Sequence, residues 1–156
     1  MMNGQIPNWD EYYMAVATLT SKRSKDPCTQ VGACIVNTDK KLIGMGYNGF
    51  PKGCSDLEFP WGKESEDELN TKFPYVVHAE LNAILNSTTS VKGATIYVTR
   101  FPCNECAKAI IQAGIAEVVY SQDKHPEKPS FVAARRMFSS AGIKCRNISS
   151  VEVILK

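Results

Sequence analysis

Two short stretches of metal-ligating and acidic residues constrain this chain more than any other feature. They are His78-Ala79-Glu80 and Pro102-Cys103-Asn104-Glu105-Cys106. Imidazole and thiolate are ligands that Zn²⁺ prefers, and a catalytic zinc site has three protein ligands. His78, Cys103 and Cys106 supply that number only if the fold brings the two stretches together. The two cysteines lie three apart where a helix is predicted to begin, so both sulfurs can face one point.

Glu80 decides between two kinds of zinc site. A structural zinc is closed by four protein ligands, whereas three ligands with a nearby carboxylate leave a position for water and supply its base. We therefore predict that one Zn²⁺ per subunit is held by His78, Cys103 and Cys106, and that Glu80 is the catalytic acid and base. Alone, a C-x-x-C pair can be redox-active, a histidine can be a core residue, and a first-turn glutamate can serve the helix dipole. The combination favours hydrolytic chemistry.

Composition limits the size of the domain and the class of partner. The chain has 156 residues, 44% of them hydrophobic, which is enough for a single domain over residues 1–156 with a buried core. The formal net charge is +2, from 18 basic and 16 acidic residues. Because the basic and acidic residues nearly balance, the chain has no overall field that would attract nucleic acid. We expect a small anionic substrate and no nucleic-acid partner.

Cysteine usage and the N-terminal segment indicate a compartment. Six cysteines would suit a disulfide framework in a secreted protein, but the segment from Met1 to Trp9 is polar and contains Pro7. We therefore expect reduced thiols and a cytoplasmic protein, with Cys34 buried in an apolar strand. No run approaches the roughly 20 apolar residues of a membrane-spanning helix, so no membrane partner is expected.

Hydrophobic periodicity predicts strands that alternate with helices. Apolar residues at helical spacing predict helices over residues 9–23, 79–86, 104–113 and 131–141. Apolar runs bounded by turn residues predict strands over 31–36, 41–47, 94–99 and 115–120, and a final strand over 151–155. The first two strands form a hairpin. This order implies an α/β domain with helices packed on a partly parallel sheet.

For three segments the sequence leaves two alternative roles open. Residues 50–73 form a long loop with at most one short helical turn, which suits either a lid or an oligomer contact. Gly44, Gly46 and Gly49 allow either close packing of a strand end or a ligand-binding loop. The polar, basic turn over residues 21–27 is either a solvated helix end or part of a phosphate site.

Several motifs together connect the chain to a known family. The pairing of H-x-E with P-C-x-x-C is the signature of zinc-dependent deaminases. The segments that carry the likeness are Arg23-Ser24-Lys25-Asp26-Pro27, Thr29-Gln30-Val31-Gly32-Ala33-Cys34-Ile35-Val36, Gly46-Tyr47-Asn48-Gly49, His78-Ala79-Glu80-Leu81-Asn82-Ala83-Ile84 and Pro102-Cys103-Asn104-Glu105-Cys106-Ala107-Lys108. On these motifs the chain resembles the deoxycytidylate (dCMP) deaminases of the cytidine deaminase-like superfamily. The resemblance implies a three-layer α/β/α fold with a mixed, roughly five-stranded sheet. It also implies hydrolysis of dCMP to dUMP and ammonia, which supplies dUMP for thymidylate synthesis.

The resemblance further implies contacts with the substrate. Asn48 would hold the sugar or the base, and backbone groups near Ala79 and Cys103 would read the pyrimidine edge. The phosphate would lie near Arg23 or near the loop of residues 120–124. Relatives often carry a tyrosine after this loop that helps to hold the nucleotide. This chain has His125 there, so we expect His125 to contact the substrate.

Regulation and assembly are implied in the same way. The family is typically hexameric, activated by dCTP and inhibited by dTTP. Gly46, Tyr47, Asn48 and Gly49 would contribute to the effector site, and Mg²⁺ is expected to accompany the nucleoside triphosphate. The expected partners are therefore a nucleotide substrate, the two effectors and five further copies of the chain.

Two other functions compete with this interpretation. A tRNA adenosine deaminase or a polynucleotide cytidine deaminase has the same zinc core, because a flipped base presents similar geometry. Such an enzyme should show a basic stripe or an aromatic stacking platform, which the balanced charge argues against. A zinc-dependent interaction module without catalysis would need a fourth protein ligand and would have no use for Glu80.

Overall fold

The computed structural model describes residues 4–156. The first three residues of the polar N-terminal segment lie outside the described residues. The helices are α1 (Trp9–Ser21), α2 (Ala79–Leu85), α3 (Asn104–Gln112) and α4 (Pro129–Ala141), with a 3-10 turn over Glu68–Asn70. The strands are β1 (Gly32–Val36), β2 (Leu42–Tyr47), β3 (Thr95–Arg100), β4 (Glu117–Gln122) and β5 (Lys144–Asn147).

The five strands form one mixed sheet in the order β2-β1-β3-β4-β5. Strand β1 runs antiparallel to both β2 and β3, while β3, β4 and β5 run parallel to one another. The predicted hairpin and the partly parallel sheet are therefore confirmed. Because β3 and β4 are parallel, their carboxyl ends lie side by side at one edge of the sheet, where Arg100 pairs with Gln122.

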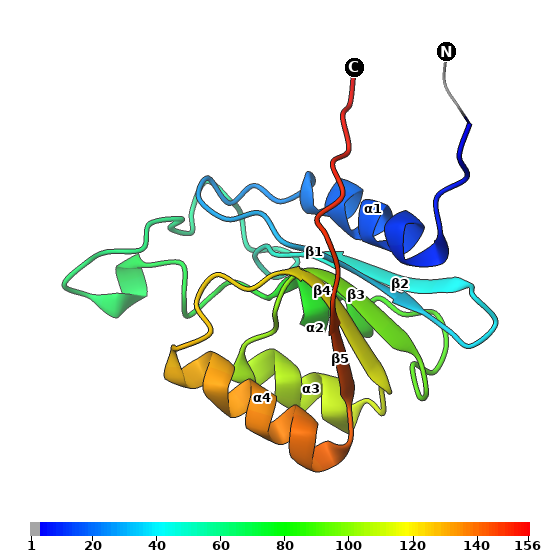
Figure 1. Ribbon diagram of the computed structural model, residues 1–156. Coiled ribbons are helices and arrows are strands. Elements are labelled where there is room, and N and C mark those ends of the chain that lie inside the picture. Colours follow the sequence, from blue (N-terminus) through cyan, green and yellow to red (C-terminus); the bar gives the residue numbers. More distant parts are fainter. Residues whose placement is uncertain (1–3) are drawn as a thin grey trace.

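Helices cover both faces of the sheet, which gives three layers (Figure 1). On one face α1 packs Tyr13, Met14 and Ala17 against the sheet. On the other face α2, α3 and α4 bury a larger apolar cluster that includes Ile110 and Phe138. The predicted α/β/α architecture is confirmed. Cys34 lies in the smaller cluster, where burial raises the pKa of its thiol to about 12, as expected for an inert core residue.

Glycine at position 46 lets β2 lie directly against α2. A Cβ atom added to Gly46 would overlap the backbone of that helix at Ala79 and Ala83. Only a residue without a side chain fits between the strand and the helix. A Cβ atom added to Gly49, in contrast, would make only an ordinary van der Waals contact with the Tyr47 ring, at 3.9 Å. Close packing therefore explains Gly46, and this contact fixes the position of the helix that begins beside His78.

The C-terminal strand differs from the prediction. Residues 151–155 form no strand, and the predicted one is wrong; the last strand is β5, over Lys144–Asn147. Its sequence, Lys-Cys-Arg-Asn, has no apolar alternation. It is held instead by parallel backbone pairing with β4 and by Arg146, which donates to Glu117 at 2.6 Å and to Asp10 at 2.7 Å. Ile154 and Leu155 beyond it are exposed.

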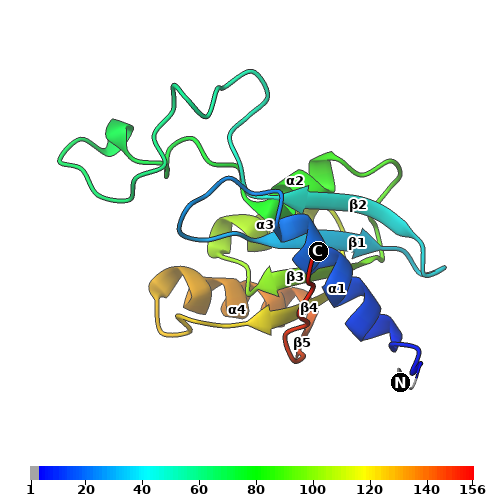
Figure 2. The same cartoon turned by 90° about the horizontal axis from the view of Figure 1, so that it is seen from above.

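The segment between β2 and α2 forms a long loop that projects beyond the edge of the sheet (Figure 2). Its one regular turn is the 3-10 helix at Glu68–Asn70, as predicted. Phe50 and Trp61 pack at a tilt with their ring centroids 4.1 Å apart, and Phe59 meets Tyr75 edge-on at 5.0 Å. The loop therefore has its own aromatic contacts. None of the helices within residues 4–156 has the length and apolar character needed to cross a membrane.

Candidate zinc centre

The two motifs occupy the beginnings of two helices that meet on one face of the sheet. His78 is the N-cap residue of α2 and Cys103 is the N-cap residue of α3. Both have extended backbone conformations, and neither side chain caps its own helix. Glu80 and Cys106 lie in the first turns that follow. The side chains are thus free to converge, and the helix N-termini favour anionic forms of the carboxylate and the thiols.

The ligand atoms of His78, Cys103 and Cys106 all lie within 4.8 Å of one another. His78 Nδ1 is 3.5 Å from Cys103 Sγ and 3.4 Å from Cys106 Sγ. With Zn–S of about 2.3 Å and Zn–N of about 2.0 Å, a tetrahedral angle at the metal separates sulfur from nitrogen by about 3.5 Å. The three side chains therefore fit one Zn²⁺, with His78 binding through Nδ1.

Glu80 lies beside this cluster and is only 5% exposed. Its Oε2 is 3.5 Å from Cys106 Sγ. Burial raises the pKa of Glu80 above its ordinary value, and the positive charge of His78 partly opposes this effect. A carboxyl group whose pKa is shifted towards neutrality can both accept and return a proton near pH 7. The position suits a general acid and base.

Hydrogen bonds within the cluster determine which sulfur carries negative charge before a metal binds. Hydrogen bonding with Cys106 and with His78 lowers the pKa of the Cys103 thiol to about 4. The same contact with Cys103, together with burial, raises the pKa of Cys106. Hydrogen bonding to Cys103 raises the pKa of His78 to about 9. Because zinc needs two thiolates and a neutral imidazole, its binding must displace protons from Cys106 and His78.

A cavity of about 570 Å³ opens beside this cluster and is lined by His78, Glu80 and Cys103. Of the residues predicted to bind substrate, Asn48, Ala79 and His125 line it. Arg23 does not: it is exposed after the end of α1 and is not among the lining residues. Lysine and arginine side chains nevertheless line the cavity, and they are Lys63, Lys72, Arg100, Lys124 and Lys128.

One wall of the cavity contains a buried polar cluster of Asp26, Asn48 and Lys72. Lys72 forms an ion pair with Asp26, and the two side chains are 8% and 1% exposed. Asp26 also accepts hydrogen bonds from the backbone amides of Cys28 at 2.8 Å and Thr29 at 3.1 Å. Asn48 donates to Asp26 and accepts from an amide at the start of β1. The cluster therefore joins the 24–30 turn, the end of β2 and the long loop.

The Asn48 side chain also connects two backbone segments. Its Oδ1 accepts from the backbone amide of Val31 at 2.9 Å, and its Nδ2 donates to the carbonyl of Thr29 at 2.9 Å. The side chain is 6% exposed. Tyr47 and Gly49, predicted with Gly46 to bind effectors, do not line the cavity. Of the four residues predicted to bind effectors, Asn48 alone lines this cavity.

Sequence reasoning missed Lys72 and Arg100. Arg100 ends β3, three residues before Cys103, so its place next to the zinc motif could have identified it. Lys72 lies in a loop with no periodic signal, and nothing in its immediate sequence points to Asp26. Its ion pair depends on a contact between residues that are far apart along the chain.

Comparison with known proteins gives the family. The model for the cytidine and deoxycytidylate deaminase zinc-binding region matches residues 7–122, which include the histidine, the glutamate and both cysteines of the cluster. The chain belongs to the cytidine and deoxycytidylate deaminase family. Membership agrees with the zinc-ligand geometry and confirms the resemblance seen in the motifs.

Individual members of the family are similar over most of their length. The deoxycytidylate deaminase of Homo sapiens is 58% identical over 139 residues, which are 88% of this chain and 78% of the relative. The probable deoxycytidylate deaminase of Drosophila melanogaster is 52% identical over 143 residues, which are 88% of this chain and 70% of the relative.

Solved structures share the fold of this chain. The dCMP deaminase from the cyanophage S-TIM5, in complex with dCMP and dUMP, is 28% identical and has a TM-score of 0.74. The match covers 92% of this chain and 99% of that one. A tRNA:A34 deaminase is 22% identical with a TM-score of 0.54, covering 88% of this chain and 97% of that one. At that identity the likeness shows the fold alone.

Proposed function

We propose that this protein is a zinc-dependent dCMP deaminase that hydrolyses dCMP to dUMP and ammonia, acting as a single domain over residues 1–156. The observation that carries the proposal is the 58% identity to a deoxycytidylate deaminase over 88% of the chain. The convergence of His78, Cys103 and Cys106 beside a buried glutamate supports it, because this set of residues suits hydrolytic zinc chemistry.

His78, Cys103 and Cys106 would hold the metal, with His78 binding through Nδ1. When bound, Zn²⁺ lowers the pKa of a water molecule from about 15.7 towards about 7 and so supplies a nucleophile at neutral pH. The helix N-termini at Cys103 and His78 keep the three ligands in place. The chain's own contribution to chemistry then rests on Glu80.

Glu80 moves the protons of the reaction. Its carboxylate takes a proton from the attacking water and gives it to the ring nitrogen next to the amino-bearing carbon of cytosine. The second water proton follows the same route to the departing amine, which leaves as ammonia. Burial favours this exchange because it brings the pKa of Glu80 closer to that of the groups between which it transfers protons.

The lining of the cavity supports the other proposed substrate contacts around this centre. Ala79, buried at the start of α2, would offer backbone groups to the pyrimidine edge, and His125 would face the nucleotide from the opposite loop. Asn48 would act on the sugar or base from the buried polar cluster. Arg23 has no support from its position, so the phosphate is better placed near Lys124.

We also propose the regulation that the resemblance implies, namely activation by dCTP and inhibition by dTTP in a hexamer, with Mg²⁺ on the nucleoside triphosphate. The effector site would include Gly46, Tyr47, Asn48 and Gly49. Gly46 touches the backbone of α2, the helix that carries Glu80. A ligand that shifts this segment would therefore act on the catalytic residue through one packed contact.

Substrate choice and catalysis are tested by one set of assays. Ammonia release is measured with cytosine, cytidine, dCMP, dCTP and an adenosine-containing RNA hairpin, each with and without added dCTP as effector. We expect dCMP to react fastest. If dCMP were inert while the RNA hairpin reacted, the tRNA deaminase alternative would replace this proposal.

Glu80→Gln tests the mechanism. The variant keeps the shape of the side chain but cannot carry the proton, so we expect turnover to fall by about 10²- to 10⁴-fold while zinc stays stoichiometric by metal analysis. Near-normal turnover would remove Glu80 from the mechanism. If the wild-type protein turned over none of the substrates in the panel, the non-catalytic zinc module would replace this proposal.

A further inference from the structure

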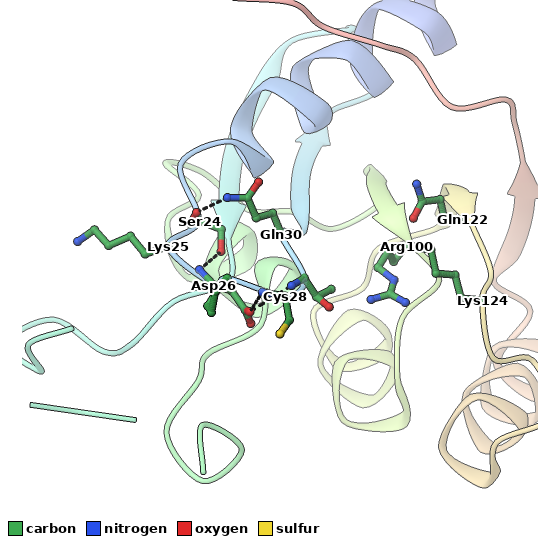
Figure 3. A pocket seen from close by; sticks show the side chains of 10 residues that line it. Ser24, Lys25, Asp26, Cys28, Gln30, Arg100, Gln122 and Lys124 are labelled. Atoms are coloured by element: carbon green, nitrogen blue, oxygen red, sulfur yellow. Dashed lines mark hydrogen bonds between the residues drawn. The ribbon is translucent and has the colours of Figure 1, made fainter. Parts of the chain in front are cut away.

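A second, polar cavity of about 550 Å³ adjoins the zinc-site cavity. The two share Asp26, Thr29, Arg100 and Lys124 among their lining residues. One side of the polar cavity is the turn of residues 24–30, and the other is formed by Arg100, Gln122 and Lys124 (Figure 3). The cavity therefore lies where β3 and β4 end, next to the cavity that contains Glu80.

The basic residues of this cavity differ in their availability. Lys25 forms an ion pair with Asp56 at 2.8 Å, and its side chain extends away from Arg100 (Figure 3). The side chains of Arg100 and Lys124 have no hydrogen-bond or ion-pair partner within residues 4–156. The only acid that lines the cavity is Asp26, whose carboxylate is already held by Lys72 and by two backbone amides. The unpaired charge on the wall is therefore positive.

The position of Arg100 is set by the same segment that carries a zinc ligand. Arg100 is the last residue of β3, and Cys103 follows three residues later. Three residues of extended chain span at most about 10 Å, which a nucleoside monophosphate can bridge from its base to its phosphate. The carboxyl ends of parallel strands are also where α/β proteins bind ligands. A guanidinium presents a planar fork of donors that matches phosphate oxygens.

We infer that this polar cavity is an anion subsite and that Arg100, assisted by Lys124, makes the enzyme select a nucleotide over the corresponding nucleoside. The inference rests on the proposed function for the identity of the base. Arg100 contacts the 5′-phosphate, while Gln122, its partner in the β3–β4 register, and Thr29 line the same space with neutral polar groups. Lys25 takes no part.

The test measures selectivity and binding separately. Wild type, Arg100→Gln, Arg100→Lys and Lys25→Gln are compared by the ratio of kcat/KM for dCMP to kcat/KM for deoxycytidine. A lost charge-assisted contact lowers this ratio by about 10- to 100-fold. We expect that loss for Arg100→Gln, mainly through KM, with partial recovery in Arg100→Lys. Lys25→Gln removes one positive charge from the same cavity and should keep the wild-type ratio.

Calorimetry with dUMP, deoxyuridine and inorganic phosphate gives a readout that does not depend on turnover. Arg100→Gln should lose affinity for dUMP and inorganic phosphate but not for deoxyuridine, with zinc content and melting temperature unchanged. An unchanged dUMP affinity and dCMP ratio in Arg100→Gln, or an equal loss in Lys25→Gln, overturns the inference. If wild type failed to deaminate dCMP but bound dUMP through Arg100, the proposed function would fail and the anion subsite would stand.

Discussion

The buried ion pair between Lys72 and Asp26 should hold the long loop against the rest of the structure. Lys72→Met removes the charge while keeping much of the apolar stem. Removing one partner of a buried ion pair typically costs about 3–5 kcal/mol, because the other charge stays buried without compensation. Here the Asp26 carboxylate keeps the amides of Cys28 and Thr29 and the side chain of Asn48 as donors. We therefore expect a cost at the lower end, about 3 kcal/mol.

Asp26→Asn should cost more than Lys72→Met. The Asp26 oxygen that faces Lys72 also accepts from Asn48. An amide nitrogen in its place would point a donor at two donors. Lys72 would then lie 8% exposed without an acceptor for its ammonium group within residues 4–156. We expect a loss near the upper end, about 5 kcal/mol.

A double-mutant cycle separates the pair from its surroundings. If Lys72 and Asp26 stabilise each other, the double variant Lys72→Met/Asp26→Asn loses less than the sum of the single variants, by up to about 3 kcal/mol. Urea unfolding at one fixed, saturating zinc concentration measures each free energy, since zinc binding itself adds stability. Additivity within about 0.5 kcal/mol would refute the coupling.

The same pair predicts a dependence on pH. Burial alone would raise the pKa of Asp26, but the hydrogen bond from Lys72 and those from the amides of Cys28 and Thr29 lower it below the ordinary value. A group with a lowered folded pKa contributes its full stability above its unfolded pKa, about 3.9, and loses that contribution as the pH falls through the folded value. The gap in unfolding free energy between wild type and Asp26→Asn should therefore shrink below about pH 4.

Three further predictions concern packing and metal binding. Gly46→Ala should destabilise the protein by about 1–3 kcal/mol in urea unfolding, because its Cβ overlaps the α2 backbone, whereas Gly49→Ala should be close to neutral; equal effects would contradict the packing argument. Cys106→Ala should abolish stoichiometric zinc, while exposed Cys28→Ala should retain it by metal analysis. Zinc uptake near pH 7 should release protons into a weakly buffered indicator solution, since the pKa of His78 is about 9; no release would show that the ligands are already deprotonated.

The sequence predicted most of the elements because their apolar residues follow the period of the structure they form. The helix at α3 and the strand at β3 show this, since Cys106, Ala107 and Ile110 are the buried face of one and Ile96 to Val98 the buried run of the other. The metal ligands were predictable for a different reason. Their spacing within each motif is short, and only the approach of the two motifs depends on the fold.

Long-range polar contacts could not be predicted in this way. Strand β5 carries polar residues and is placed by backbone pairing and by Arg146, whose partner Asp10 lies at the other end of the chain. Lys72 finds Asp26 across a shorter gap of 46 positions. Neither contact leaves a periodic pattern in the sequence. Local pattern therefore could not predict strand β5 or the ion pair between Lys72 and Asp26.

The charged residues around the zinc centre separate by role because they differ in burial and partners. Lys72 and Asp26 are almost fully buried and use their charges on each other, so changes there should appear in stability. Arg100 has no such partner, and its change should appear in KM. Both sets line the same cavity, and Arg100 shares its segment with Cys103. The segment that leaves β3 therefore places the metal ligand and the proposed phosphate contact together, while the Lys72–Asp26 pair fixes the wall that faces them.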